Sequence, residues 1–219
     1  MITKLLISAA TCMTLIATHA GANLITNGSF ETGPNPGSFT DLAGGSTAIT
    51  GWTVTLNHLD YIGSLWVASN GVRSLDLEGS NCVLFTSNCA GGIEQSFATT
   101  PGQQYTVSFD LAGNPFNVPI EKFITVLAAG QSQTFSFDIT GKSTGNMGWV
   151  THTFTFTAAG PNTILEFQTA DGAAVSGWGP ALDNVSVDAV GVGAVPEPGV
   201  FGMVGLGIAA LALIRRRLT

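Results

Sequence analysis

The sequence predicts an all-β domain, a two-sheet β-sandwich most typical of a jelly roll, with a short hydrophobic segment at each end of the chain. Apolar and polar residues alternate through the middle of the 219-residue chain, which is the period-two pattern of half-buried strands. Turn sequences such as Pro101-Gly102 and Gly160-Pro161 separate the alternating runs. Residues 23–194 contain no convincing amphipathic helix pattern.

The alternation is clearest in three segments, QYTVSFDLAG at 104–113, QTFSFDI at 133–139 and THTFTFT at 151–157. Similar runs predict further strands near 73–77, 92–97, 122–128, 163–168 and 182–190. About eight to ten short strands at this spacing are typical of a two-sheet sandwich. We therefore assign residues 23–190 to one β-sandwich domain.

The first 22 residues predict an export signal. Lys4 precedes an apolar stretch at 5–16, and Ala20-Gly21-Ala22 has the small-residue pattern that signal peptidase cleaves. Asn23 is then the expected new N-terminus. A folded N-terminal helix is the alternative interpretation.

The C-terminal segment predicts a hydrophobic helix that contacts the membrane. Residues 191–199 form a linker with Val195, Pro196, Glu197 and Pro198, and 200–214 are 15 residues without a charge. As a helix they reach only ~22 Å, short of the ~30 Å hydrocarbon core. A basic cluster follows and is expected to stay on the cytoplasmic side, formed by Arg215, Arg216 and Arg217. A permanent tail anchor and a core helix are the alternatives.

This tail, Val-Pro-Glu-Pro followed by a glycine-rich hydrophobic run and three arginines over 200–219, resembles the PEP-CTERM sorting signal. The resemblance implies cleavage near Pro196–Pro198 by an exosortase. It also implies a Gram-negative cell-surface or extracellular-matrix destination, with the chain anchored in the inner membrane only until cleavage.

Charge and cysteine content narrow the class of protein further. Residues 23–194 hold 13 acidic and 3 basic residues, a net charge of −10. Such a surface repels phosphate backbones, which excludes nucleic acid as the main partner. Two cysteines remain after export, Cys82 and Cys89, and an even count in an oxidising compartment predicts a disulfide.

Beyond its tail, the chain resembles the choice-of-anchor C family. The residues that carry the resemblance are NLITNGSFETG at 23–33, SLDLEG at 74–79, the stretches 91–115 and 130–158, and GPALDNVSV at 179–187. That family is similar to domain of unknown function 642 and, more distantly, to galactose-binding-like carbohydrate-binding modules. The resemblance implies a galactose-binding-like jelly roll that associates with polysaccharide, and no reaction. The cysteine segment at 80–90 departs from it.

The resemblance also implies a structural Ca²⁺ ion, held by Glu31 in NGSFE and Asp183 in ALDNV. Carboxylates and loop carbonyls suit this hard cation. Asp183 shares strand parity with Val185 and Val187, so we expect its side chain to point inward, where an unpaired carboxylate is costly. The alternative is that Glu31 is a solvated turn residue and Asp183 caps a loop. No other cofactor is expected.

Sugar binding in such modules uses aromatic faces and neighbouring amides. Trp52 and Trp149 begin strand-like runs and are assigned to the core. The candidates for carbohydrate contact lie in expected loops: Trp66, Trp178, Asn114 and Phe116. For each of these, ordinary packing is the competing interpretation.

An enzyme is not predicted, because the chain has no H-E-x-x-H or paired-cysteine zinc spacing. The letters GKSTG at 141–145 match G-x-S-x-G, but they lie in an expected hairpin turn and not in a strand-to-helix elbow. A glycosidase uses two carboxylates, and Asp76 and Glu78 are expected on one strand face. On so acidic a protein, however, such pairs also arise without catalysis. We therefore expect an exported, non-catalytic surface protein that binds exopolysaccharide or cell-wall carbohydrate. A structural matrix protein without specific sugar binding is the main alternative, and a glycan hydrolase is the weakest.

Overall fold

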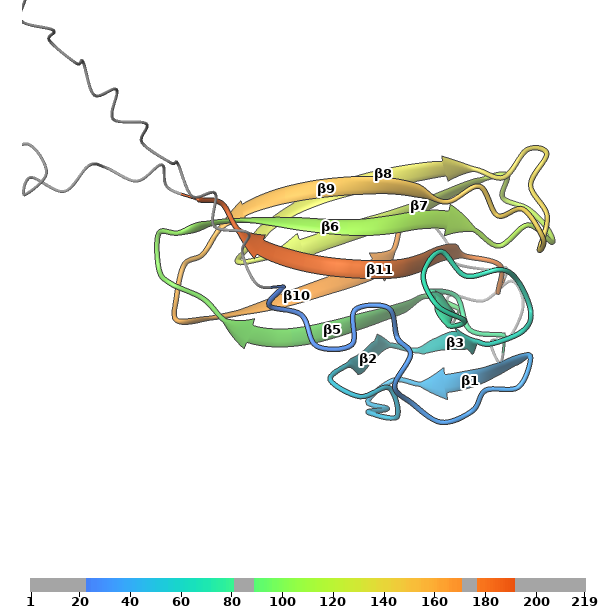
Figure 1. Ribbon diagram of the computed structural model, residues 1–219. Helices are drawn as coiled ribbons and strands as arrows, with labels where there is room; N and C mark the ends of the chain where they lie inside the picture. The colour runs from blue at the N-terminus through green and yellow to red at the C-terminus, as the bar shows by residue number, and fades with distance from the viewer. Residues whose placement is uncertain (1–22, 81–88, 171–176, 192–219) are drawn as a thin grey trace, which may run out of the picture. The chain divides into compact units, whose positions relative to one another are not determined.

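A computed structural model of the chain describes residues 23–80, 89–170 and 177–191, and these ranges contain two antiparallel β-sheets (Figure 1). The six-stranded sheet has the order β1-β3-β4-β11-β6-β9. Its strands are β1 (Phe39–Ala43), β3 (His58–Ile62), β4 (Ser74–Asp76), β11 (Pro180–Ala189), β6 (Gln104–Gly113) and β9 (Val150–Thr157).

The five-stranded sheet has the order β2-β5-β10-β7-β8. Its strands are β2 (Thr53–Leu56), β5 (Gly91–Ala98), β10 (Asn162–Thr169), β7 (Glu121–Ala128) and β8 (Gln131–Asp138). The residues Ala129 and Gly130 join β7 and β8, and both have positive φ, 51° and 73°. Two such residues in a two-residue loop match the right-handed twist of a hairpin.

The core lies between the two sheets and is rich in aromatic rings. Phe109 of β6 is at the centre, with its ring centroid 5.2 Å from that of Phe167 on β10 and 5.3 Å from that of Phe135 on β8. Both contacts are edge-to-face, the arrangement that aromatic quadrupoles favour. These partners belong to the opposite sheet. The apolar side chains of the alternating pattern therefore pack between the inner faces of the two sheets. The predicted all-β two-sheet fold is confirmed.

Each of the eight predicted strand regions contains an observed strand, and β2 follows Trp52, which begins a strand-like run, whereas β1 and β3 were not predicted. β3 shows why, because four of its five residues are buried and Asp60 is among them. A strand that is covered on both faces shows no alternation of polar and apolar residues. Trp52 is 2% exposed and donates a hydrogen bond from Nε1 to the Asn27 carbonyl, so it belongs to the core as expected.

The loop between β3 and β4, residues 63–73, lies over the beginning of β11 (Figure 1, teal). Two links tie it to the segment before β9: Val67 N donates to the Thr144 carbonyl, and Trp149 Nε1 donates to the Val67 carbonyl. Trp149 is half-buried and packs against the core. The loop therefore covers part of the outer face of the six-stranded sheet.

Candidate functional site

The outer face of the six-stranded sheet carries acidic side chains that are buried. Asp183 is opposite Asp110, while Leu182 is opposite Leu111 in the core. Since neighbouring residues of a strand point to opposite faces, Asp110 and Asp183 point away from the core. They are nevertheless 5% and 0% exposed, because loop 63–73 covers them.

The expectation that Asp183 points inward with Val185 and Val187 is wrong. The pairing of β11 with β6 shifts register between Asp183 and Ser186, and Asn184 within this bulge has φ of 53°. One extra residue reverses the alternation. As a result Val187 faces the core while Asp183 faces the covering loop.

Both predicted calcium ligands hold loop 63–73 by accepting backbone hydrogen bonds. Asp183 Oδ2 accepts from the amides of Ser69 and Asn70, both at 2.8 Å, and Asp183 Oδ1 accepts from Asn184 N at 2.6 Å. Glu31 Oε1 accepts from the amides of Val72 and Arg73, both at 2.8 Å. The two carboxylates thus bind the two halves of one short segment.

This geometry bears directly on the calcium hypothesis. Three of the four carboxylate oxygens of Glu31 and Asp183 receive N–H groups, whose positive ends occupy the lone pairs that a cation needs. Within the described ranges, no group of three or more His, Cys, Asp or Glu side chains is arranged for a metal ion. As placed, the two residues do not offer an open donor set for the ion that the resemblance implies.

Burial sets the protonation of these acids. It raises the pKa of Asp183 to about 7 despite the opposing backbone N–H bonds from Asn70, Asn184 and Ser69, and that of Asp60 to about 6 against its bonds from Ser80. Burial also raises the pKa of Asp76 well above its ordinary value, with the neighbouring Asp60 adding to the effect. A carboxyl group taken out of water favours its neutral form.

Three of the four predicted carbohydrate contacts, Asn114, Phe116 and Trp178, lie near one another at one end of the domain. The side chain of Asn114 donates from Nδ2 to Asp76 at 2.7 Å. The backbone N–H of Asn114 donates to the carbonyl of Gly179, which follows Trp178 in the chain. The buried Lys122 ammonium donates to the carbonyls of Asn117 and Trp178.

The exposure of the four candidates differs greatly. Trp66 and Asn114 are each only 4% exposed, and Trp66 Nε1 donates to Ser74 Oγ at 2.8 Å. Phe116 is 55% exposed and Trp178 is half-buried. Trp66 and Asn114 are therefore used mainly within the fold, and the sugar-contact role of all four stays a prediction.

The carboxylate pair considered for hydrolysis is enclosed. Asp76 and Glu78 are both 0% exposed. Asp76 accepts hydrogen bonds from Asn114, from Gly179 N at 2.9 Å and from Glu78 N at 3.1 Å. A general acid or base has to reach its substrate within hydrogen-bond distance, so this arrangement argues against a catalytic role for the pair.

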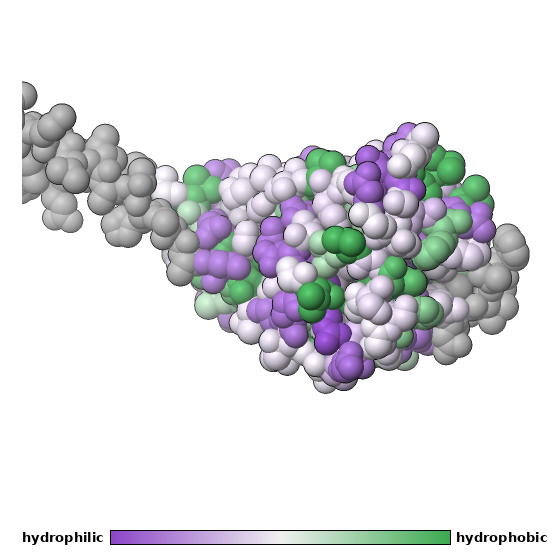
Figure 2. Space-filling view, turned by 45° about the vertical axis from the view of Figure 1, so that its right-hand side comes forward, coloured by the Kyte–Doolittle hydropathy of each residue, from purple (hydrophilic) through white to green (hydrophobic). Residues whose placement is uncertain are grey.

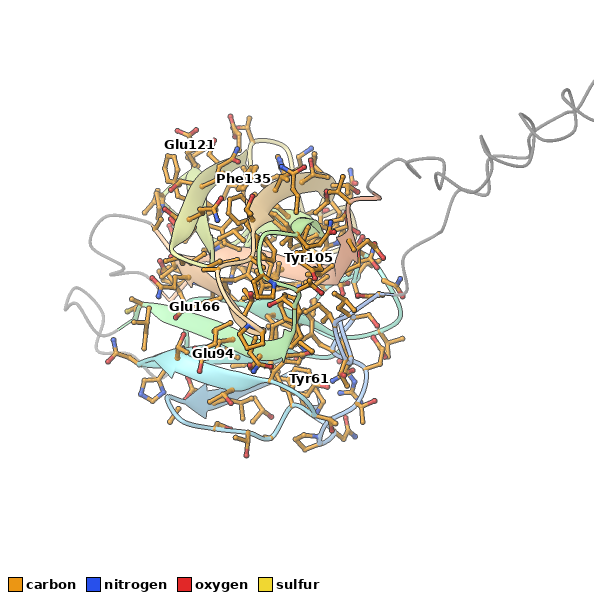
Figure 3. The ribbon with its side chains drawn as sticks, turned by 90° about the vertical axis from the view of Figure 1, so that its left-hand side faces the viewer. Tyr61, Glu94, Tyr105, Glu121, Phe135 and Glu166 are labelled. Carbon is orange, nitrogen blue, oxygen red and sulfur yellow. The ribbon has the colours of Figure 1, made fainter. Side chains whose placement is uncertain are left out.

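The outer face of the five-stranded sheet, in contrast, is open. Along β5, Ile93 and Phe97 face the core, so Glu94 points outward; along β10, Leu165 and Phe167 face the core, so Glu166 points outward. The two glutamates are direct cross-strand partners and lie next to each other in Figure 3. Neither makes a hydrogen bond or ion pair with any described residue.

Two rows of side chains cross this face, with one residue from each strand. The first row is Thr53, Glu94, Glu166, Leu127 and Ser132, and the second is Thr55, Gly92, Gln168, Thr125 and Thr134. A hollow of about 520 Å³ lies on this face and includes both glutamates and Leu127. Thr55 Oγ1 in the second row is buried without a hydrogen-bond partner.

Sequence reasoning missed this site. The alternation around GGIEQSF and ILEFQT predicts that Glu94 and Glu166 point outward, but it does not show that β5 and β10 are neighbours in this register. Pairing of distant segments is decided by the whole sheet. The open face combines unpaired carboxylates, hydroxyls and an amide on rigid strands, which suits hydrogen bonding to a polyhydroxylated ligand.

Other predictions fall partly or wholly outside the described residues. Cys89 is fully buried, but Cys82 is outside them, so the disulfide stays a prediction. The signal segment 1–22 and the residues of the sorting motif, Val195 to Pro198 and Arg215 to Arg217, are also outside. Within 23–80, 89–170 and 177–191, no helix is long and apolar enough to span a membrane.

Comparison with family models confirms both predicted resemblances. The family described as Protein of unknown function (DUF642) matches residues 23–188, and the PEP-CTERM protein-sorting motif matches residues 194–217. A PEP-CTERM sorting signal indicates an exported, cell-surface protein. Halomucin of Haloquadratum walsbyi is 31% identical over 170 residues, covering 75% of this chain but only 2% of Halomucin.

Solved structures with similar folds include the arabinose-bound MgGH51 α-L-arabinofuranosidase, with a TM-score of 0.51 and 17% identity over 77% of this chain and 26% of the enzyme. TmCBM61 in complex with β-1,4-galactotriose has a TM-score of 0.44 and 14% identity, over 77% of this chain and 99% of that one. At 17% identity, the likeness to the arabinofuranosidase concerns the fold alone. The likeness to TmCBM61, with its TM-score of 0.44, carries no further argument.

Proposed function

Since the chain belongs to the family described as Protein of unknown function (DUF642) and ends in a PEP-CTERM motif, we propose that it is an exported, non-catalytic protein that binds carbohydrate. The binding site is the open outer face of the five-stranded sheet. The observation that carries this proposal is the opposed pair Glu94 and Glu166, which faces a hollow and has no hydrogen-bond or ion-pair partner among the described residues.

The chemistry of the pair favours a neutral sugar polymer as ligand. Each carboxylate can accept two or more hydrogen bonds, and charged acceptors make stronger bonds than neutral ones. Vicinal sugar hydroxyls supply such donors. Like charges directly opposite on a sheet are destabilising, so the fold itself gains nothing from this pair. Gln168 and the threonines of the second row add further donors and acceptors.

The surroundings of the pair favour an extended ligand. Both rows run across all five strands, so the polar groups form a line rather than one point. At Gly92, an added Cβ would lie 2.4 Å from Thr55 Oγ1 and 2.9 Å from the Phe167 carbonyl. A glycine therefore fits here, and no side chain projects from this position of the second row. Among the described residues, neither Trp nor Tyr occurs in a strand of this sheet. Affinity therefore rests on polar contacts.

Affinity electrophoresis of the exported chain in gels that contain soluble neutral polysaccharides tests the proposal. We expect retardation by at least one polysaccharide, and a loss of about tenfold or more in affinity in Glu94→Gln/Glu166→Gln, because hydrogen bonds to charged groups are worth about 1.5–3 kcal/mol. Glu121→Gln, on the same sheet but outside the two rows, is the matched control.

Two results would reject the site. Unchanged retardation of the double variant would place sugar binding elsewhere. No retardation by any polysaccharide, with correctly folded protein, would favour a structural matrix protein that binds no specific sugar.

We further propose that an exosortase removes the tail after signal peptidase has cleaved the N-terminus, and that the chain is anchored in the inner membrane of a Gram-negative cell in between. The match of the sorting motif to residues 194–217 supports this. Intact mass of the chain recovered from the cell surface tests it: we expect a product that begins at Asn23 and ends near Pro196 to Pro198. A product that keeps Arg215 to Arg217 would exclude cleavage.

A further inference from the structure

A second hollow, of about 440 Å³, lies between the segment before β1 and loop 63–73. It is on a different part of the domain from the open sheet face. Its apolar wall comes from Trp66, Val67, Ala68 and Val72, and its polar lining includes Asn35, Ser64 and Arg73. The volume is in the range of small-ligand sites. In the view of Figure 2 the hydrophobic residues form small separate patches between hydrophilic ones, so this surface has no single apolar expanse.

The wall of this hollow is held firmly in place. Trp66 is anchored through Nε1 to Ser74, and Glu31 accepts the amides of Val72 and Arg73. Loop 63–73 is therefore restrained by hydrogen bonds of its backbone and of a side chain at residues that line the hollow. A binding site on a restrained loop loses less conformational entropy when it takes up a ligand.

Arg73 is the unusual residue of the hollow. Its guanidinium makes no hydrogen bond and no ion pair within 4.0 Å among the described residues, and its Nε is buried without a partner. The guanidinium carbon lies 5.6 Å from the centroid of the Tyr61 ring. A cation over an aromatic face keeps its N–H groups available at its edge.

An unpaired guanidinium is unexpected here, because acidic residues outnumber basic ones 13 to 3 in residues 23–194. The Glu31 carboxylate accepts hydrogen bonds from the backbone amides of Val72 and Arg73. It is not within ion-pair distance of the guanidinium. The buried Nε and the free edge therefore lack the acceptor that buried charged groups normally have.

From this geometry we propose that the hollow binds a carboxylate-bearing sugar, a uronate unit of an acidic glycan. The carboxylate pairs with the Arg73 guanidinium, and the sugar ring packs against the exposed side chains of Val67 and Val72. The planar fork of arginine matches a carboxylate through two parallel hydrogen bonds. A neutral sugar has no group that neutralises the cation, and Asn35 and Ser64 are placed to bond the ring hydroxyls.

This site is independent of the neutral-sugar site proposed above. Among the residues that the structure describes, the hollow of the open face is lined by Glu94 and Glu166 and by no basic side chain, whereas the hollow at Arg73 is lined by no acidic one. Long-range repulsion between a uronate and the acidic protein is screened beyond about 8–10 Å at ordinary salt. Binding at Arg73 therefore depends on the local contact.

NMR titration of the ¹⁵N-labelled exported chain with methyl glucuronide, methyl glucoside and inorganic phosphate tests the inference. We expect methyl glucuronide to shift the Arg73 Nε–H resonance in a saturable way, and methyl glucoside to leave it unchanged. Arg73→Gln is expected to abolish binding of the uronide. Arg73→Lys, which keeps the charge but not the fork, is expected to weaken it by about tenfold. Lys142→Gln, which also removes one positive charge, is the matched control.

The remaining outcomes are decisive. Uronide binding that survives in folded Arg73→Gln, or a uronide that does not shift the Nε–H resonance, would overturn the assignment. Phosphate that binds as tightly as the uronide would show a general oxyanion site and reject the sugar. If Arg73→Gln does not fold, Arg73→Lys and the wild-type titration still decide. Glu94→Gln/Glu166→Gln is expected to bind the uronide normally, so failure at one site is distinguishable from failure at the other.

Discussion

The two outer faces of this sandwich treat their carboxylates in opposite ways. On the six-stranded sheet, Asp110 and Asp183 lie beneath loop 63–73 and receive N–H and O–H donors from it. On the five-stranded sheet, Glu94 and Glu166 face each other in an open hollow and receive none from the described residues.

The number of donors that each carboxylate receives distinguishes a structural role from a binding role. A buried carboxylate with several donors stabilises the loop that supplies them, and its replacement changes folding. A half-buried, like-charged pair that receives no donor from the described residues costs the fold a little and is available to a ligand. Acidic residues alone do not mark a site; the donors around each one decide its role.

The largest expected effect is at the covered face. Trp66→Ala removes a 4% exposed side chain from beneath the loop, and we expect a loss of about 3–5 kcal/mol in the free energy of unfolding. The equivalent change on the open face, Ile164→Ala, where the side chain is 52% exposed, is expected to cost less than about 1 kcal/mol. Urea denaturation measures both, and similar losses would remove the distinction between the faces.

The pH dependence of stability is the next largest effect. Burial holds the pKa of Asp183 at about 7 and of Asp60 at about 6 in the folded chain. Between the ordinary value of 3.8 and these values, the folded state binds more protons than the unfolded state. The free energy of unfolding therefore falls as pH rises through this window and is lowest above about pH 7.

We expect a decrease of at least about 2 kcal/mol between about pH 5 and pH 8, measured by urea denaturation. Asp60→Asn is expected to flatten the lower part of the profile. Burial lowers the pKa of His152, and this half-buried group acts in the opposite direction, so His152→Gln is expected to steepen the decrease. Stability that rises from pH 5 to pH 8 would contradict these assignments.

A smaller effect is expected on the open face. Glu94→Gln removes the repulsion across the β5–β10 pair, and we expect a gain of about 0.5 kcal/mol together with weaker polysaccharide binding. Glu166→Gln is expected to do the same, and the double variant to gain no more than either single one. Additive gains in this double-mutant cycle would show that the two carboxylates do not interact.

The smallest effect concerns calcium. Because N–H groups already occupy three of the four oxygens of Glu31 and Asp183, we expect excess CaCl₂ or EDTA to leave the Tm unchanged. A rise in Tm with calcium that Glu31→Gln abolishes would show instead that an ion displaces these donors. MgCl₂ is the control for a general salt effect.

Much of the fold was predictable from local patterns. The alternation of Tyr105, Val107 and Phe109 against Thr106 and Ser108 predicted β6 and its buried face. The motifs NGSFE and ALDNV predicted the family. Two strands, β1 and β3, were missed because they are short or buried on both faces.

The site was predictable only in part, because its geometry depends on contacts between distant segments. Ser69 and Asp183, 114 residues apart in sequence, meet through one hydrogen bond. The bulge after Asp183 reverses an otherwise reliable parity argument. Trp66 looked like a free loop aromatic, but it packs beneath its own loop and bonds Ser74.

The sequence by itself determined the strand periodicity, the acidic charge and the sorting motif, because each depends only on neighbouring residues or on composition. The tertiary structure decided which carboxylates face each other, which are covered and which guanidinium lacks a partner. Hydrogen bonds and burial at these positions arise from strand pairing and loop packing across the whole domain. Local sequence does not specify that pairing, so the chemistry of the two hollows emerges only in the folded chain.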